Sequence, residues 1–168
     1  MKFANWFKTI EEFIIYINKN FYSVKSTINP SIYETNNFLL KQCEITLIKY
    51  AVFFGSNQIF NYLRQNGAEL NSSLWFFAAH GQSEEIIHFL EENKILPLKK
   101  GKVEYGPIYK ESIKCHHTDL SNYIQNDYLP IDKVNSNETL LCCIKYYNFM
   151  FMQKNIYNEA LFCCLCKY

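Results

Sequence analysis

The stretch that most constrains the fold is residues 46–71, with the sequence TLIKYAVFFGSNQIFNYLRQNGAELN. Thr46 and Ser56 are of the type that caps helix starts, and each is followed by apolar side chains at helical spacing. Gly55 stands where the first helix has to end, because glycine enters the left-handed conformation at little cost. A turn at Asn66-Gly67 follows the second helix. The stretch therefore predicts two short helices that need neighbours to bury their apolar faces.

Shifted copies of the same pattern follow along the chain. A shift of 27 positions places Leu63 on Leu90, and a shift of 61 positions places it on Ile124. A weaker first helix is expected at 139–147, and another at 160–168 stops before its second helix begins. The spacing between copies is uneven, so we expect an irregular stack of helix-turn-helix repeats.

These copies divide the chain into three parts. Residues 1–44 predict helices over 3–19 and from about 32 to 42, which form a helical N-terminal cap or a degenerate repeat. Residues 45–128 hold the better copies, at 45–71, 72–106 and 107–128, with a loop at 93–106. Residues 129–168 hold degenerate and truncated C-terminal copies. The predicted fold is therefore all-α.

The composition argues against several classes of protein. Hydrophobic residues make up 49% of the chain, and only 5 Gly and 4 Pro are present, which disfavours a strand-and-turn sandwich. A net charge of +1 without a basic stripe disfavours nucleic-acid binding. The apolar runs are too short for a signal peptide or a membrane span. The seven cysteines are odd in number, and six of them follow position 114. This fits reduced thiols better than a disulfide framework. We therefore expect an intracellular, cytoplasmic protein that binds neither nucleic acid nor membranes.

The sequence of residues 46–71 resembles the ankyrin repeat, which places Thr-Pro-Leu-His before Ala-Ala, Gly, an Ile-Val pair, Leu-Leu and Gly-Ala-Asp. From about residue 37 to 128 it is similar to a divergent ankyrin-repeat branch of protists, which carries a domain of unknown function. The runs that carry this similarity are Glu44-Ile45-Thr46-Leu47-Ile48, Ser73-Leu74-Trp75, Ile86-Ile87-His88-Phe89-Leu90-Glu91-Glu92-Asn93 and Ile113-Lys114-Cys115-His116-His117. The resemblance implies an ankyrin-type α-solenoid, irregular and with an incomplete C-terminal repeat.

The sequence departs from the ankyrin pattern at several positions. Leu47 and Lys49 replace the proline and the histidine of the first-helix signature. Gln82 and His116 stand where the family has glycine, so we expect those helices to end by another device. The missing helix after Tyr168 should leave an apolar C-terminal face. We expect a monomer, or weak self-association through that face.

In the ankyrin family, hairpin tips and late first-helix positions line a concave groove that binds a protein partner. The matching positions of this sequence are Phe53, Phe54, Glu69, Asn71, Ser72, His80, Lys114 and Cys115. Aromatic side chains are common anchors in protein interfaces. Phe53 and Phe54 also suit a hydrophobic core, and the sequence leaves that choice open. The resemblance implies a non-catalytic protein-protein interaction scaffold with a protein partner of unknown identity.

Cysteine and histidine residues suggest one alternative function. Cys115-His116-His117, with His80 and His88, and the pair Cys163 and Cys166 are zinc-ligand types, but no second well-spaced pair accompanies either cluster. A Cys115 nucleophile would need an activating base and an oxyanion site, and the common phosphate, dinucleotide and metalloprotease motifs are missing. We predict no enzyme activity, no cofactor and no metal; the alternative is a metal-dependent Cys/His regulatory module.

Overall fold

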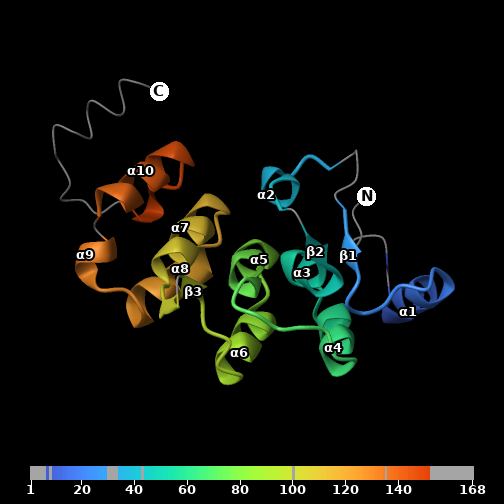
Figure 1. Cartoon of the computed structure of the whole chain (residues 1–168). Coiled ribbons are helices and arrows are strands. Elements are labelled where there is room, and N and C mark those ends of the chain that lie inside the picture. The colour runs from blue at the N-terminus through green and yellow to red at the C-terminus, as the bar shows by residue number, and fades with distance from the viewer. Residues whose placement is uncertain are drawn as a thin grey trace. The chain divides into compact units, whose positions relative to one another are not determined.

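The computed structural model describes residue 7 and residues 9–29, 34–42, 44–99, 101–134 and 136–151. Over these residues the chain is mostly helical (Figure 1). It divides into two compact units, Met1–Leu96 and Pro97–Tyr168, and each is treated separately below. Among the described helices, none combines the length and the apolar character that crossing a membrane requires.

The first unit begins with helix α1, Ile10–Lys19. The Thr9 hydroxyl caps it by accepting a hydrogen bond from the backbone N–H of Glu12. The helix buries Phe13 and Ile17 and packs against α4, Asn57–Gln65. The predicted helix over 3–19 is thus confirmed from residue 10 onward, and most of its earlier part lies outside the described residues.

The helix expected from about 32 to 42 is a single turn, α2, Asn37–Leu40. It begins late because the Asn36 side chain caps it, accepting hydrogen bonds from the N–H groups of Phe38 and Leu39. The Glu34 carboxylate accepts hydrogen bonds from the next two backbone N–H groups and so stabilises a turn before the helix. Residues 34–36 are therefore not helical, contrary to the prediction. Residues 30–33 lie outside the described residues.

The predicted helical character is confirmed for the described residues, and two short antiparallel ladders, which were not predicted, accompany the helices. In the first unit, β1 (Thr27–Ile28) pairs with β2 (Ile45–Thr46), and Thr27 lies opposite Thr46. In the second unit, β3 (Leu98–Lys99) and β4 (Lys102–Val103) form a hairpin within the expected loop at 93–106. Strands of two residues are too short to leave an alternating apolar pattern in a sequence.

Two helical hairpins form the centre of the first unit. The first joins α3 (Leu47–Phe53) to α4, and the second joins α5 (Leu74–Gly81) to α6 (Glu84–Glu92). The Thr46 hydroxyl accepts from the Lys49 N–H, which confirms the predicted cap of α3. Helix α3 packs on both α4 and α5, and α4 also packs on α6, so the hairpins lie side by side. Their shared core includes Tyr50, Phe60, Trp75 and Leu90.

Glycine ends α3 as predicted and also brings two backbones together. Gly55 has a φ of +62°, and the N–H groups of Gly55 and Ser56 donate to the carbonyls of Val52 and Ala51. A Cβ atom on Gly55 would lie 2.2 Å from the Gly81 carbonyl oxygen, and one on Gly81 would lie 2.0 Å from that of Val52. The ends of α3 and α5 therefore approach at a distance that only glycine allows.

A polar cluster joins α4 to α6. The Glu85 carboxylate accepts hydrogen bonds from the side-chain amides of Asn57, at 2.6 Å, and Asn61, at 3.1 Å. The Ser83 hydroxyl donates to the Asn57 amide oxygen at 2.6 Å and also caps α6. The Arg64 guanidinium lies 4.4 Å from the centroid of the Phe89 ring. These contacts fix the alignment of α4 and α6.

The second unit contains α7 (Gly106–Lys114), α8 (Thr118–Asp127), α9 (Ile131–Val134), α10 (Asn137–Lys145) and the 3₁₀ turn η1 (Phe149–Phe151). Helix α7 packs against α8 and α10. The hydroxyls of Ser112 and Ser121 lie 2.8 Å apart in the buried α7–α8 contact, and each is also within hydrogen-bonding distance of a backbone carbonyl. The copy expected at 160–168 lies outside the described residues.

The expectation that helices without glycine end by another device is wrong. His116 has a φ of +56°, and the N–H groups of His116 and His117 donate to the carbonyls of Ile113 and Ser112, as at Gly55. Gln82 is also left-handed, with a φ of +51°. A left-handed conformation costs a residue with a Cβ about 1–2 kcal/mol. Gln82 and His116 therefore adopt the left-handed conformation at a higher energy than glycine would.

Candidate functional site

Three of the predicted binding residues meet in the first unit. The Phe53 ring centroid lies 4.9 Å from that of Phe54, edge to face, and 4.9 Å from that of His80, stacked. Phe53 is 7% exposed, whereas Phe54 and His80 are half-buried. Phe53 is thus a buried side chain, and its two neighbours form the accessible part of the cluster.

A fourth ring, which the sequence did not predict, covers this cluster. Phe38 of α2 lies with its ring centroid 4.3 Å from that of His80, 5.1 Å from that of Phe77 and 5.9 Å from that of Phe53. We call Phe53, Phe77 and His80 the Phe38 socket. Phe38 escaped prediction because it belongs to the N-terminal segment, outside the copies on which the site residues were placed.

The other predicted residues of the first unit lie in the turn before α5. Glu69 is exposed, whereas Asn71 and Ser72 are half-buried. The Asn71 amide oxygen accepts hydrogen bonds from the N–H group and the hydroxyl of Ser73, at 3.1 and 2.6 Å. Asn71 therefore stabilises the turn, and its amide oxygen is already engaged.

Lys114 and Cys115 belong to the second unit, at the end of α7. The Lys114 ammonium lies 2.7 Å from the Glu111 carboxylate and 5.9 Å from the centroid of the Tyr146 ring. Cys115 is half-buried beside it. The predicted residues are therefore divided between the two units, and each unit has to be considered as a separate surface.

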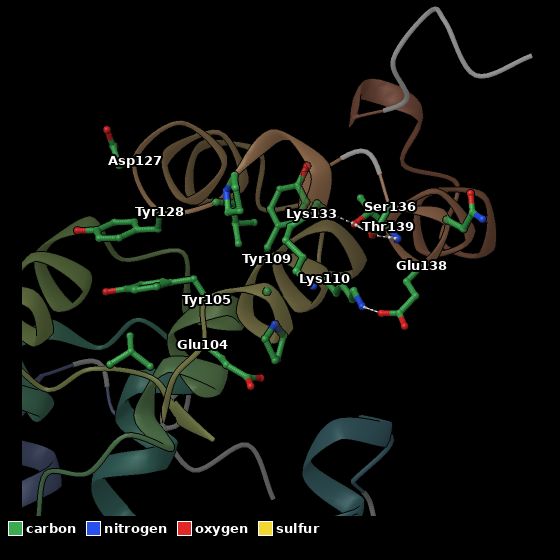
Figure 2. Close-up of a pocket in the computed structure, with 16 residues that line it drawn as sticks. Glu104, Tyr105, Tyr109, Lys110, Asp127, Tyr128, Lys133, Ser136, Glu138 and Thr139 are labelled. Carbon is green, nitrogen blue, oxygen red and sulfur yellow. Dashed lines mark hydrogen bonds and ion pairs between the residues drawn. The ribbon is translucent and has the colours of Figure 1, made fainter. Parts of the chain in front are cut away.

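The second unit has a pocket of about 790 Å³ between the start of α7, the end of α8, α9 and the start of α10 (Figure 2). None of the predicted site residues lines it. Side chains that define its character are Tyr105, Tyr109, Lys110, Tyr128, Lys133 and Glu138. The sequence offered one signal for it, the tyrosines on either side of Gly106-Pro107, but nothing that brought Tyr128 to them.

One wall of this pocket is aromatic. The rings of Tyr105 and Tyr128 stack with centroids 4.1 Å apart and planes 16° apart, and they lie parallel in Figure 2. Tyr123 meets Tyr128 edge to face, and the two hydroxyls lie 3.1 Å apart. The buried Tyr109 donates its hydroxyl to the amide oxygen of Gln125 at 3.0 Å. Burial raises the pKa of Tyr109, so its hydroxyl stays protonated at neutral pH.

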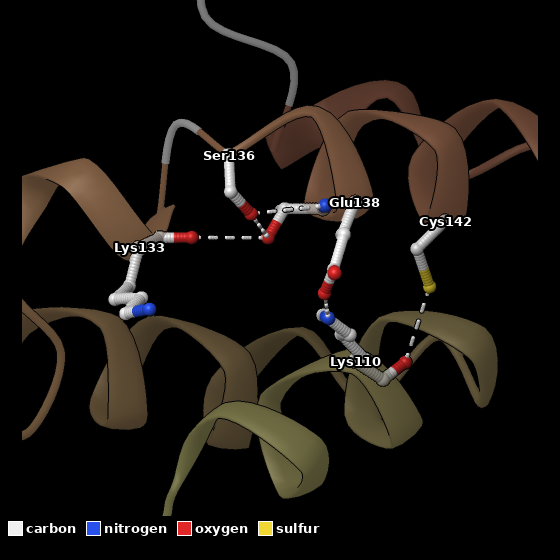
Figure 3. Close-up of polar contacts among 6 residues, drawn as sticks. Lys110, Lys133, Ser136, Glu138 and Cys142 are labelled. Carbon is white, nitrogen blue, oxygen red and sulfur yellow. Dashed lines mark hydrogen bonds and ion pairs between the residues drawn. The ribbon is translucent and has the colours of Figure 1, made fainter.

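The opposite wall is polar and joins three helices (Figure 3). Lys110 of α7 forms an ion pair with Glu138 of α10, and the Cys142 thiol donates to the Lys110 carbonyl at 3.4 Å. The Thr139 hydroxyl donates to the Lys133 carbonyl of α9 at 3.2 Å. The Ser136 hydroxyl caps α10 by accepting from the Thr139 N–H. These side chains mainly fix α7, α9 and α10 to one another.

The described thiols of the second unit, Cys115, Cys142 and Cys143, are poorly suited to nucleophilic chemistry. Burial raises the pKa of Cys115 to about 12 and that of Cys143 to about 11, and it also raises the pKa of Cys142. Such thiols are protonated at neutral pH, whereas the thiolate is the form that attacks carbon centres or binds metals. At neutral pH these three thiols are therefore weak nucleophiles.

The histidines next to Cys115 lie in different environments. His116 is exposed, whereas His117 is 6% exposed and precedes α8 as its N-cap residue. Among the described residues of the second unit alone, no three ligand atoms of the kind that bind metals converge. Cys163 and Cys166, the other predicted ligand types, lie outside the described residues.

The molecule is thus defined by helical hairpins, an aromatic cluster in one unit and an aromatic-walled pocket in the other. No family model matches this sequence, and no significant match was found among curated proteins or among solved structures. The ankyrin resemblance therefore remains a prediction from the sequence.

Proposed function

We propose that this protein is a non-catalytic scaffold of the ankyrin-repeat type that binds a protein partner in the cytoplasm. The proposal takes residues 45–128 as an irregular stack of helix-turn-helix repeats. It assigns binding to the first helices and the turns between hairpins of each unit, where Phe54, His80 and Glu69 are accessible in the first unit and Lys114 in the second.

One observation carries the proposal. Helix α3 packs on α5 and α4 packs on α6, with the backbones at Gly55 and Gly81 in direct approach. Contacts between equivalent helices of successive hairpins are what a stacked-repeat architecture requires, because each hairpin buries its apolar face against the next. The α7–α8 hairpin of the second unit ends its first helix with the same left-handed turn, at His116.

The aromatic side chains of the cluster in the first unit and of the pocket in the second unit also support binding. Aromatic side chains supply large contact areas at low entropic cost, which explains their frequency at interface hot spots. The protonated state of the Cys115 thiol and the paired state of Lys110 and Glu138 support a non-catalytic role. Tyr147 and Met150, which are 75% and 74% exposed, are suited to the weak self-association expected of the C-terminal face.

Affinity capture with matched variants tests this proposal. The bait would be the wild-type chain, the double variant Phe54→Ser/Lys114→Glu, and the control Gln65→Ser, which alters an exposed residue of α4. We expect a protein that the wild type and the control enrich and that the double variant loses, with unchanged helicity by circular dichroism.

Two results would contradict the proposal. One is the absence of any protein whose capture depends on Phe54 and Lys114. The other is stoichiometric zinc in the purified protein by elemental analysis, which would favour the metal-dependent regulatory module instead.

A further inference from the structure

The Phe38 socket holds an aromatic ring from a segment outside the helical hairpins. Phe53 of α3 and Phe77 and His80 of α5 surround the Phe38 ring, with centroid distances between 4.3 and 5.9 Å. The socket is therefore formed by first helices of two adjacent hairpins, on the face to which the proposed function assigns partner binding.

The segment that fills the socket resembles a docked peptide in its construction. Helix α2 is one turn long, and its two adjacent anchors are Phe38 and the fully buried Leu39. The segment also makes hydrogen bonds within itself, among them the Asn36 cap and a bond from the Gln42 side-chain amide to the Phe38 carbonyl. Short helical segments bind grooves in this manner, through a few apolar anchors on one face.

A positive charge at the rim of the socket favours a negatively charged group in a bound segment. The Lys49 ammonium lies 5.8 Å from the centroid of the Phe77 ring. Four residues before Phe38, the segment carries the carboxylate of Glu34, which is close enough to Tyr50 of α3 to influence it electrostatically. A carboxylate near the aromatic anchor of a bound segment would suit the Lys49 ammonium at this rim.

We propose that the Phe38 socket is the recognition site for a partner segment with an acidic residue, an aromatic anchor and an adjacent aliphatic anchor, and that the segment carrying Glu34, Phe38 and Leu39 occupies it in cis, through the Phe38 ring, until such a partner segment displaces it. This inference rests on the proposed function. A tethered segment competes at a high effective concentration, in the millimolar range for short linkers. Removal of the Phe38 ring is therefore expected to increase the affinity for a competing segment at least about tenfold.

A peptide titration tests this inference without a cellular partner. The probe is a fluorescently labelled peptide of residues 34–42, ETNNFLLKQ, and its control is the same peptide with alanine in place of the phenylalanine. The proteins are the wild type, Phe38→Ala, and Phe21→Ala, which removes a phenylalanine of the same unit that is 94% exposed. We expect the probe to bind Phe38→Ala at least about tenfold more tightly than the other two proteins, and the control peptide to bind none of them.

Equal binding to all three proteins, or no binding to a folded Phe38→Ala chain, would overturn the inference. If Phe38→Ala does not fold, Phe38→Leu replaces it in the same titration. Loss of folding in both variants would show that Phe38 is a core residue and would also overturn the inference. Peptide binding without any captured cellular protein would count against the proposed function alone. A captured partner combined with no peptide binding would count against the inference alone.

Discussion

The ends of α3 and α7 make the same turn with different residues. At Gly55 the left-handed residue has no side chain, and the turn lies against the backbone of Gly81. At His116 the left-handed residue carries an exposed imidazole, although the two closing hydrogen bonds are equivalent. Backbone hydrogen bonds therefore define the turn, and the packing of a neighbouring backbone segment determines whether glycine is required. Four predictions compare the units to which these turns belong, from the largest expected effect to the smallest.

The largest effect is expected from Gly81→Ala. The new Cβ would lie 2.0 Å from the Val52 carbonyl oxygen, which belongs to the backbone and cannot move aside cheaply. We expect a loss of about 3 kcal/mol or more in the free energy of unfolding, measured by urea titration. The control is Gly106→Ala, where no atom lies within 4 Å of the added Cβ and little change is expected. A neutral Gly81→Ala would mean that α3 and α5 do not approach as described.

The second prediction concerns alkaline pH and separates the two units. The Cys115 and Cys143 pKa values, about 12 and 11 in the folded chain, exceed the ordinary value of 9.0. Their contribution to stability is complete below pH 9.0 and declines as the pH rises toward 11–12, because the unfolded thiols ionise first. Hydrogen exchange between pH 8 and 11, corrected for intrinsic rates, should show the second unit losing protection before the first.

The control for the alkaline experiment is the variant Cys115→Ala/Cys143→Ala. It removes both titrating thiols and should make the loss of protection in the second unit less steep. An equal decline in both units, or an unchanged slope in the variant, would count against the role of these thiols.

The third prediction compares the two turns directly. His116→Gly should increase the free energy of unfolding by about 1 kcal/mol, because glycine removes the strain of a left-handed residue. Gly67→Ala is the matched opposite change, since Gly67 has a φ of +84° and no atom lies within 4 Å of its added Cβ. It should decrease stability by a similar amount. Thermal unfolding of the three proteins would measure both shifts, and a destabilised His116→Gly chain would argue that the imidazole stabilises the turn.

The smallest effect is expected from Glu138→Gln. This change removes the ion pair with Lys110, but the Glu138 side chain is largely exposed, so solvent screens most of the attraction. We expect a loss of no more than about 0.5 kcal/mol by urea titration. Asp132→Asn, at an exposed position of α9, serves as the control. A loss of several kcal/mol would show that the polar wall of the pocket holds the second unit together.

Sequence patterns predicted the helices well where caps and periodicity act locally. The Thr46 cap, the Gly55 turn and the start of α7 near Pro107 follow from residues within one helical turn. The β1–β2 ladder was missed because it joins short segments that are distant in sequence. Gly81 was not singled out, since its importance comes from a carbonyl on another helix.

The candidate site was predicted only in part, for the same physical reason. Phe53, Phe54 and His80 do meet, as positions on neighbouring first helices should. The ring that covers them, Phe38, comes from a segment without the repeat pattern. The stack of Tyr105 on Tyr128 depends on how two helix ends converge, which no local pattern encodes.

The contacts of Glu85 have a consequence for protein engineering. Its carboxylate accepts hydrogen bonds from the side-chain amides of Asn57 and Asn61 of the preceding hairpin. The position equivalent to Glu85 in that preceding hairpin, 27 residues earlier, is Gln58, a neutral amide. Tandem duplication of the α3–α4 hairpin would therefore set amide against amide at the new junction and lose the carboxylate acceptor. The hairpins are consequently not interchangeable modules, and their order along the chain is specified chemically as well as by shape.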